Sequence, residues 1–495
     1  MPNECIFHIK EGELMECKGD IEIIEIPDGV RIVSGGAFAN CTNLKHIFIP
    51  SSVESLSEKE ILWGGTPFYS CKNLKDIIVS DDNNFYKSID GNLYTKDGKT
   101  LIQYAIGRKD DSFTVPEGIT SIASSAFFGC CSLTKVKISN SVTNINEGAF
   151  FNCSNLKEIF ISKSVMFIAN NDWISFNGGG AFENCENLSK IIVSKDNSVY
   201  KSIDGNLYTK DGKTLIQYAS GKKEMEFTVP DTVIYIKGGA FQNCQSLKNI
   251  CFSNNIKKIG SRAFCCCRNL TNIILPNKIT EIKEALFASC ENLVEIGLPH
   301  GIKRIERDAF YGCTSLTKLI IPNTVVYIEY SAFCNCNNLS TIDLPESLQF
   351  LELKARTEDI IEGFAGIGEG AKQINISSNN TIYKSIDGNL YSKDGRELIL
   401  YASGKTEEIF VVPKGVNVIQ DYAFSLSLLK HIIIPHDIAI IGEGAFQECD
   451  NLTIYCEAQS KPIGWKYNWN PNNRPVIWGY KNTNWELLRD EKWNF

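Results

Sequence analysis

Apolar and polar residues follow one short pattern that returns along the whole chain. In the copy at residues 316–339, the opening residues are Leu-Thr-Lys-Leu-Ile-Ile-Pro, and one residue separates Leu319 from Ile321. Such alternation predicts a short strand. Pro322 ends the strand, because proline cannot donate a hydrogen bond to a central ladder. Each copy is therefore expected to begin with one short strand, which we call the first leg.

The rest of each copy supplies a second apolar pair and an aromatic residue. In the same copy Val326 and Ile328 form the second leg, and Ala332-Phe333 fills the interior on the return leg. No single copy can bury its own apolar face, so each must stack against the next. The cleanest run carries one phenylalanine every 23 residues, at Phe241, Phe264, Phe287, Phe310 and Phe333. A fixed short period of this kind predicts a solenoid.

We count 17 such copies, or rungs, by the position of the first Leu or its substitute. They begin at residues 21, 44, 74, 110, 133, 156, 188, 224, 247, 270, 293, 316, 339, 371, 407, 429 and 452. Nine of the 16 steps between them are 23 residues, so the period holds along the chain. If each rung adds one strand spacing of roughly 4.8 Å, the stack spans roughly 80 Å.

Three steps of 36 residues contain the same inserted segment, Tyr-Lys-Ser-Ile-Asp-Gly-Asn-Leu-Tyr. Its Asp-Gly pair is a strong hairpin-turn signal between β-rich segments. We expect each insert to be a two- or three-stranded excursion from the solenoid, and we call it a cassette. The expected parts are an N-terminal cap segment (1–20), the solenoid (21–452) with cassettes near 80–109, 194–223 and 377–406, and a Trp-rich C-terminal cap and tail (453–495).

One position of the first leg should face outward, because it lies between two buried residues. We call this position, four residues after the first Leu, the outer column. It holds Glu25, Phe48, Ile78, Thr114, Lys137, Phe160, Ile192, Thr228, Cys251, Ile274, Gly297, Ile320, Asp343, Asn375, Val411 and Ile433. A solvated face should be mostly polar, yet nine of these 16 residues are apolar. Either the second leg or the cassettes cover the column, or a partner binds it, with Phe48, Phe160, Ile192, Ile274 and Ile320 as candidate anchors.

The repeat unit, Ile-Pro-x-x-Val-x-x-Ile followed by Ala-Phe-x-Asn-Cys-x-Asn-Leu, resembles the BspA-like class of leucine-rich repeats. The cassette segment and the ending at 454–480 are also similar to that class. The resemblance implies a β-rich, right-handed leucine-rich-repeat solenoid with protein-binding or adhesive roles, often at a microbial cell surface. It brings no common catalytic residues. Surface members carry an export signal, whereas this N-terminus lacks a basic segment followed by an apolar one.

Composition restricts the classes of partner that the chain is expected to bind. The formal net charge of −8 and the pI near 5.4 argue against nucleic acid or an anionic membrane. No apolar run of 18 residues occurs, so we expect no membrane insertion. By sequence alone the chain is expected in the cytoplasm, while the resemblance implies the cell surface.

Eleven of the 19 cysteines occupy one repeat position, two residues before an Asn-Leu or its equivalent: 41, 71, 130, 153, 185, 244, 267, 290, 313, 336 and 449. We expect them to be small buried residues in a reducing compartment rather than a disulfide framework. Cys265 and Cys334 lie three rungs apart, roughly 14 Å by strand spacing, which is too far for one zinc ion.

No catalytic motif is present: the five histidines do not form His-Glu-x-x-His, and no Gly-x-Ser-x-Gly occurs. We therefore expect a monomeric, non-catalytic scaffold that binds a protein partner and needs no cofactor. The alternative is an intracellular enzyme inhibitor or regulator, acting as a ribonuclease inhibitor does. An enzyme or a carbohydrate-binding protein is a third possibility.

Tryptophan gathers at the C-terminal end, with five of the seven in the last 31 residues. Because a solenoid end exposes its apolar rung, we expect the segment through about residue 480 to cap the stack, with an aromatic ligand site as the alternative. Trp63 and Trp173 precede cassettes and are expected to buttress them.

Overall fold

The structure is a computed structural model, and it describes residues 5–19, 21–39, 41–56, 66–170, 179–353 and 370–481. Within these ranges the regular elements are strands joined by tight turns. Trp63, Trp173, Trp485 and Trp493 lie outside the described residues, and so does the expected buttressing of the cassettes by the first two.

The first leg of every rung is a short strand, as the alternation predicts. In β29 the side chain of Leu319 is buried while those of Lys318 and Ile320 are exposed. In the described residues the first-leg strands are β3 (Ile23–Glu25), β5 (His46–Ile49), β7 (Asp76–Val79), β11 (Ser112–Thr114), β13 (Lys135–Lys137), β15 (Glu158–Ile161), β17 (Lys190–Val193), β21 (Glu226–Thr228), β23 (Asn249–Cys251), β25 (Asn272–Ile273), β27 (Glu295–Gly297), β29 (Lys318–Ile320), β31 (Thr341–Leu344), β33 (Gln373–Ile376), β37 (Ile409–Val411), β39 (His431–Ile434), β41 (Thr453–Cys456) and β42 (Val476–Trp478).

The second leg is shorter, with two residues in each strand. In most of them the second residue is apolar and buried and the first faces solvent or is half-buried, whereas Leu56 and Leu351 are only half-buried. In the described residues these strands are β4 (Ile32–Val33), β6 (Ser55–Leu56), β12 (Ser121–Ile122), β14 (Asn144–Ile145), β16 (Phe167–Ile168), β22 (Tyr235–Ile236), β24 (Lys258–Ile259), β26 (Glu281–Ile282), β28 (Arg304–Ile305), β30 (Tyr327–Ile328), β32 (Phe350–Leu351), β38 (Val418–Ile419) and β40 (Ile440–Ile441).

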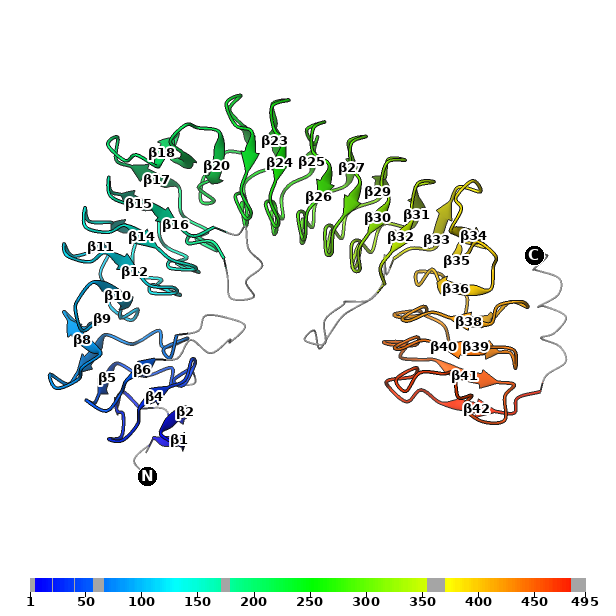
Figure 1. The fold of residues 1–495 in the computed structure, drawn as a ribbon, viewed down its shortest axis with the longest axis horizontal. Helices are drawn as coiled ribbons and strands as arrows, with labels where there is room; N and C mark the ends of the chain where they lie inside the picture. The colour runs from blue at the N-terminus through cyan, green and yellow to red at the C-terminus, as the bar shows by residue number, and fades with distance from the viewer. Residues whose placement is uncertain are drawn as a thin grey trace. The chain divides into compact units, whose positions relative to one another are not determined.

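Strands of successive rungs pair in parallel, and their register follows the period. Val136 of β13 pairs with Ile159 of β15, 23 residues later, and neighbouring rungs lie side by side (Figure 1). Each of the 17 expected rungs carries a first-leg strand, and the stack has about 19 turns when its two ends are included. The expected β-solenoid with a 23-residue period is thus confirmed.

The return leg places the repeated phenylalanine in the core. The rings of Phe127 and Phe150 stack with centroids 4.7 Å apart, and both side chains are fully buried. In most regular rungs two residues of the return leg adopt positive φ, one before the Ala-Phe pair and one before the cysteine, as Gly148 and Asn152 do. These left-handed corners explain the glycine and asparagine of the repeat, because both residue types accept that conformation.

Each cassette is a three-stranded antiparallel unit. The strands are β8 (Tyr86–Ile89), β9 (Asn92–Thr95) and β10 (Thr100–Gln103); β18 (Tyr200–Ile203), β19 (Asn206–Thr209) and β20 (Thr214–Gln217); and β34 (Tyr383–Ile386), β35 (Asn389–Ser392) and β36 (Glu397–Leu400). The hairpin turn has positive φ at both central residues, 48° at Asp90 and 72° at Gly91, as the Asp-Gly signal predicts.

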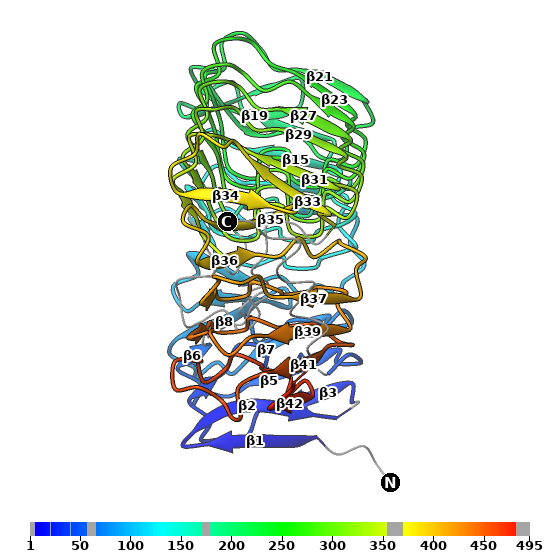
Figure 2. The same cartoon turned by 90° about the vertical axis from the view of Figure 1, so that its right-hand side faces the viewer.

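The cassettes continue the solenoid as modified rungs and do not depart from it as separate hairpins. The third strand, β10, pairs in parallel with β12 and so occupies a second-leg position. Tyr104 then takes the place of the repeated phenylalanine and stacks on Phe127 at 5.1 Å. The hairpin turn also meets the preceding first leg, since the Ile77 N–H donates to the Gly91 carbonyl at 2.8 Å. In Figure 2 the first-leg strands β29, β31 and β33 lie along one side of the stack and the cassette strands β34 and β36 along the other.

A hairpin of β1 (Ile6–Lys10) and β2 (Glu13–Lys18) precedes the first rung. A disulfide joins Cys5 to Cys17, and β2 pairs in parallel with β4. The other 17 cysteines are not in disulfides.

Two tryptophans are buried against the last rungs. The Trp465 ring lies 4.7 Å from that of Trp469, its N–H donates to the Ile438 carbonyl at 3.1 Å, and Trp469 meets Phe446 edge-on. The described part of the Trp-rich segment thus covers the apolar end of the stack, and we propose that it is the C-terminal cap.

The chain divides into two compact units. The first comprises Met1–Met225, Pro230–Leu247 and Ile259–Phe264, and the second comprises Glu226–Val229, Lys248–Lys258 and Cys265–Phe495.

Candidate functional site

The outer column faces solvent over most of its length. Eleven of its 16 members are exposed, four are half-buried, and only Ile433 is buried. The exposed fraction is 38% for Phe48, 86% for Ile274 and 49% for Ile320. Phe160 and Ile192 are half-buried. The second legs and cassettes therefore leave most of the column open, although Ile433, the register partner of Val411, is buried.

In the first unit, apolar members of the column stand in pairs. Phe48 and Ile78 are register partners on β5 and β7. Directly beside them on the same face, the His46 Nδ1 lies 3.0 Å from an Asp76 carboxylate oxygen. The apolar pair Phe48–Ile78 and the polar pair His46–Asp76 are therefore neighbours on one sheet face, so polar side chains flank the apolar pair on that side.

The same arrangement returns before the second cassette. Phe160 and Ile192 are register partners on β15 and β17, and Glu158 and Lys190 are register partners in the row beside them. Each Phe–Ile pair thus occupies the two first legs that directly precede a cassette. Phe48, Phe160 and Ile192 are candidate anchors predicted from the sequence. Ile78 is not among those candidates, although it occupies the same column.

The corresponding positions before the third cassette, in the second unit, are polar. Asp343 and Asn375 are register partners there, and the Asn375 amide donates to the Asp343 carboxylate at 2.8 Å. This pair is joined by a hydrogen bond within the chain, so it offers no apolar contact to a partner.

The second unit has its own apolar stretch of the column, from Cys251 through Ile274 and Gly297 to Ile320. Gly297 pairs with Ile320, and nothing lies within 4 Å of the place where a Cβ of Gly297 would be. The stretch therefore has two exposed isoleucines with an open notch between them. The Lys318 ammonium lies 2.9 Å from the Glu295 carboxylate in the adjacent row and borders the notch.

The repeated cysteines lie inside the solenoid, in all 11 rungs that carry them. Their thiols contact the preceding rung: Cys313 donates to the Phe287 carbonyl at 3.1 Å, and Cys336 donates to the Phe310 carbonyl at 3.1 Å. Burial raises the pKa of the Cys313 thiol and that of Cys449. Since the thiolate is the reactive form, these cysteines serve packing rather than chemistry.

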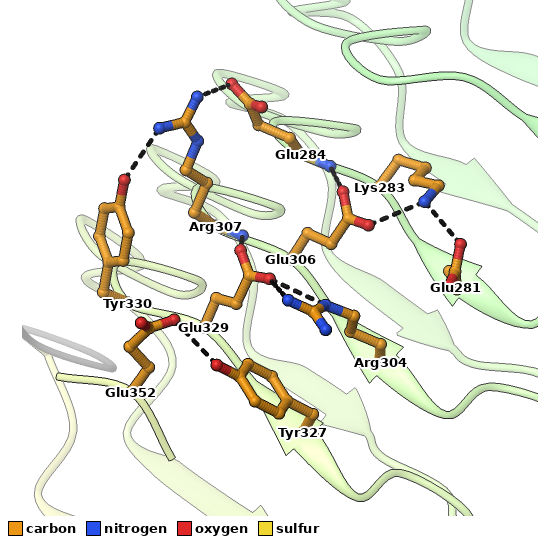
Figure 3. Close-up of polar contacts among 10 residues, drawn as sticks. All are labelled: Glu281, Lys283, Glu284, Arg304, Glu306, Arg307, Tyr327, Glu329, Tyr330 and Glu352. Carbon is orange, nitrogen blue, oxygen red and sulfur yellow. Dashed lines mark hydrogen bonds and ion pairs between the residues drawn. The ribbon is translucent and has the colours of Figure 1, made fainter. Parts of the chain in front are cut away.

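A second polar feature runs along the second legs of the second unit (Figure 3). The Arg307 guanidinium donates to the Glu284 carboxylate at 2.8 Å and to the Tyr330 hydroxyl at 3.0 Å. Its backbone N–H donates to the Glu329 carboxylate at 2.9 Å, and the Arg304 guanidinium also binds Glu329. Burial by itself would lower the pKa of the Arg307 guanidinium. The neighbouring Glu284 carboxylate favours the charged form, and the net effect is a raised pKa.

We call this set of ten residues, drawn in Figure 3, the polar ladder. Its members recur at the repeat spacing, with Glu306, Glu329 and Glu352 each 23 residues apart. This spacing was the signal in the sequence that could have revealed the ladder. The charged groups of the ladder bind one another across rungs, so the ladder holds the rungs together. The outer column therefore remains the candidate site.

Within the ranges that the structure describes, no group of three or more His, Cys, Asp or Glu side chains could hold a metal ion. The same ranges contain no helix with the length and apolar character that crossing a bilayer requires.

Short parallel first legs, buried phenylalanine and cysteine, and a 23-residue period define a leucine-rich-repeat solenoid. Residues 7–97, 108–209, 218–340, 303–357 and 397–464 match the family described as "BspA type Leucine rich repeat region (6 copies)". The chain belongs to this family. No match was found among curated proteins.

Several solved structures are similar. A leucine rich cell surface protein from Faecalibacterium prausnitzii is 27% identical with a TM-score of 0.47, and the match covers 71% of this chain and 94% of that one. A leucine-rich repeat protein from Eubacterium ventriosum is 21% identical with a TM-score of 0.43, covering 68% and 88%. The pneumococcal vaccine antigen PcpA is 18% identical with a TM-score of 0.40, covering 97% of each chain.

Proposed function

We propose that this chain is a non-catalytic scaffold that binds a protein partner through the outer column. Phe48, Phe160 and Ile192 are the anchors in the first unit, and Ile274 and Ile320 are those in the second. One observation carries the proposal: large apolar side chains stand exposed on strands whose alternate residues already supply the core. Packing within the chain does not require apolar residues there, whereas a partner would.

The affinity would come from several small contacts on a fixed surface. Burial of apolar area contributes roughly 25 cal/mol per Å², so a single isoleucine or phenylalanine adds only about 1.5–3 kcal/mol when it is fully covered. The parallel ladders hold the anchors in register before binding, which lowers the ordering cost of association.

The test is capture of a partner from an extract of the source cells by the full chain and by single variants. Phe48→Asp and Ile320→Asp place a charge at an anchor, and both should lose the partner. Thr114→Asp and Thr228→Asp are matched controls, because both threonines are exposed members of the same column. The controls should retain it. Equal capture by all four variants would contradict the proposal.

A second candidate is an intracellular inhibitor or regulator of an enzyme. The observation that favours it is the set of 17 cysteines outside disulfides, since such usage fits a reducing compartment. Adhesion at the cell surface would require the chain to lie outside. Protease treatment of intact source cells, with a cytosolic protein as control, separates the two: loss of the chain with the control spared favours adhesion, and full protection favours the intracellular regulator.

A further inference from the structure

One corner of the second unit carries two adjacent cysteines where the repeat has other residues. The residue before the repeated cysteine has positive φ, and it is asparagine in several rungs, as at Asn152 (59°) and Asn335 (58°). Cys266 occupies this position with φ of 58°. Because cysteine has no advantage in the left-handed region, where glycine and asparagine are favoured, the backbone does not explain its presence.

The neighbouring cysteine brings a second sulfur to the same place. The Sγ atoms of Cys265 and Cys266 are 3.6 Å apart, and both side chains are half-buried, so both remain within reach of a small solute. The Cys266 N–H donates to the Ala288 carbonyl of the next rung at 2.7 Å. This bond fixes the corner, so the two thiols are held on a backbone that is already ordered.

The sulfur separation fits two bonds to one soft centre. A disulfide would bring the sulfurs to about 2.05 Å. Two thiolates on one tetrahedral ion, with bonds of about 2.3 Å, lie about 3.8 Å apart. The observed 3.6 Å is a thiol–thiol hydrogen-bond contact, so the two sulfurs lie near enough for one centre to reach both, and farther apart than in a disulfide. Since the described residues provide no group of three ligands, the centre must be one that two sulfurs can satisfy.

We propose that Cys265 and Cys266 form a dithiol site for a thiophilic centre with two exchangeable positions, of which a trivalent organoarsenical is the representative. The step is a condensation without change of oxidation state. Two S–H bonds and two As–OH bonds break, two As–S bonds form, and two water molecules leave. The carbon substituent stays on arsenic and completes its three bonds.

The chain contains a matched control pair. Cys130 and Cys131 are also adjacent in sequence, but Cys130 is buried whereas Cys131 is exposed. The Cys130 Sγ lies near the Ser132 hydroxyl at 3.6 Å, and the Cys131 thiol donates to the Gly129 carbonyl at 3.2 Å. Of these two pairs, a site that needed only sequence adjacency would use both, whereas one that needs neighbouring sulfurs within reach of solvent would use Cys265 and Cys266.

The experiment titrates the folded full-length chain with phenylarsine oxide and maps the protected cysteines by alkylation and mass spectrometry. We expect one arsenical on Cys265 and Cys266, with Cys131 still open to alkylation. Because a second bond from an ordered neighbour strengthens binding by about 10²–10⁴-fold, Cys265→Ser should weaken binding by at least about 100-fold.

A second variant separates loss of the site from loss of the fold. Cys266→Asn introduces the residue that the corners at Asn152, Asn184, Asn243 and Asn335 carry, so it should melt no lower than the unmodified chain and still lose the arsenical. Protection that maps to Cys130 and Cys131, or unchanged affinity in Cys266→Asn, would overturn the proposal.

Discussion

At the scale of single residues, the direction of its side chain decides whether a phenylalanine packs in the core or lies on the candidate binding surface. Phe150 is fully buried and stacks on Phe127 at 4.7 Å and on Phe182 at 5.7 Å. Phe48 is exposed on the outer column. The same residue type thus contributes to the core in one place and to the candidate site in the other.

Truncating these two residues should have unequal effects. Phe150→Ala should lower the free energy of unfolding by about 3–5 kcal/mol, because it leaves a cavity in the stacked core. Phe48→Ala should change it by less than about 1 kcal/mol, because little packing is lost at an exposed position. Denaturant unfolding followed by circular dichroism measures both. Equal losses would mean that Phe48 belongs to the core.

Much of this residue-scale description could be predicted from the sequence. The spacing of Phe241, Phe264 and their equivalents is sufficient to identify the buried positions, because a strict period requires equivalent environments. The left-handed corners were not predicted, since the asparagine of the repeat could equally have been a surface residue. Exposure of the outer column could not be decided either, because it depends on where the second legs lie.

At the scale of elements, a buried asparagine ties each cassette to the preceding rung. The Asn197 amide nitrogen donates to the carbonyls of Ser162 and Val165, both at 2.9 Å. Its oxygen accepts from the backbone N–H groups of Val199 at 2.8 Å and Tyr200 at 2.7 Å. Asn83 and Asn380 occupy the equivalent place in the other cassettes and make the same kinds of bond. The Asp-Gly turns predicted the hairpins, but nothing local in the sequence predicted that the third strand continues the second-leg sheet.

Asn197→Leu should therefore loosen the second cassette. Leucine cannot replace the four hydrogen bonds, and each buried backbone group left without a partner costs about 1–3 kcal/mol. Hydrogen exchange of the amides in β18 and β19 should accelerate, whereas exposed Asp196→Ala should leave it unchanged. Unaltered exchange in Asn197→Leu would show that the hairpin does not depend on this residue.

The polar ladder gives a second prediction at this scale. Arg307→Leu removes an ion-pair partner of the Glu284 carboxylate, whose side chain is only 6% exposed. Breaking a buried pair in this way should destabilise the second unit by about 3–5 kcal/mol. Lys318→Ala breaks the exposed pair with Glu295 and should cost at most about 1 kcal/mol. Thermal unfolding compares the two, and similar melting temperatures would refute a structural role for the ladder.

At the scale of the whole molecule, the buried thiols make stability depend on alkaline pH. Burial raises the pKa of the Cys456 thiol from 9.0 to about 12, and it also raises the pKa of the Cys130 and Cys449 thiols. The folded chain therefore keeps these protons at a pH where the unfolded chain releases them. Stability from this source is present below about pH 9 and is lost as the pH rises toward 12.

The melting temperature should accordingly fall between pH 9 and pH 11. Part of this fall comes from buried tyrosines, since burial also raises the pKa of Tyr94 to about 12. Cys456→Ala removes one titrating thiol and should make the fall shallower than in the unmodified chain. A melting temperature that stays level up to pH 11 would contradict the account of the buried thiols.

The central claim is that the outer column binds a partner and is not needed for folding. The most direct measurement is the affinity of a captured partner for Phe160→Ala, taken together with the melting temperature of the same variant. Lys137→Ala, its register neighbour in the column, is the control. The account predicts that Phe160→Ala loses about tenfold or more in affinity, as an anchor residue should, with a melting temperature close to that of the control. A large fall in melting temperature with unchanged affinity would assign Phe160 to the core and contradict the claim.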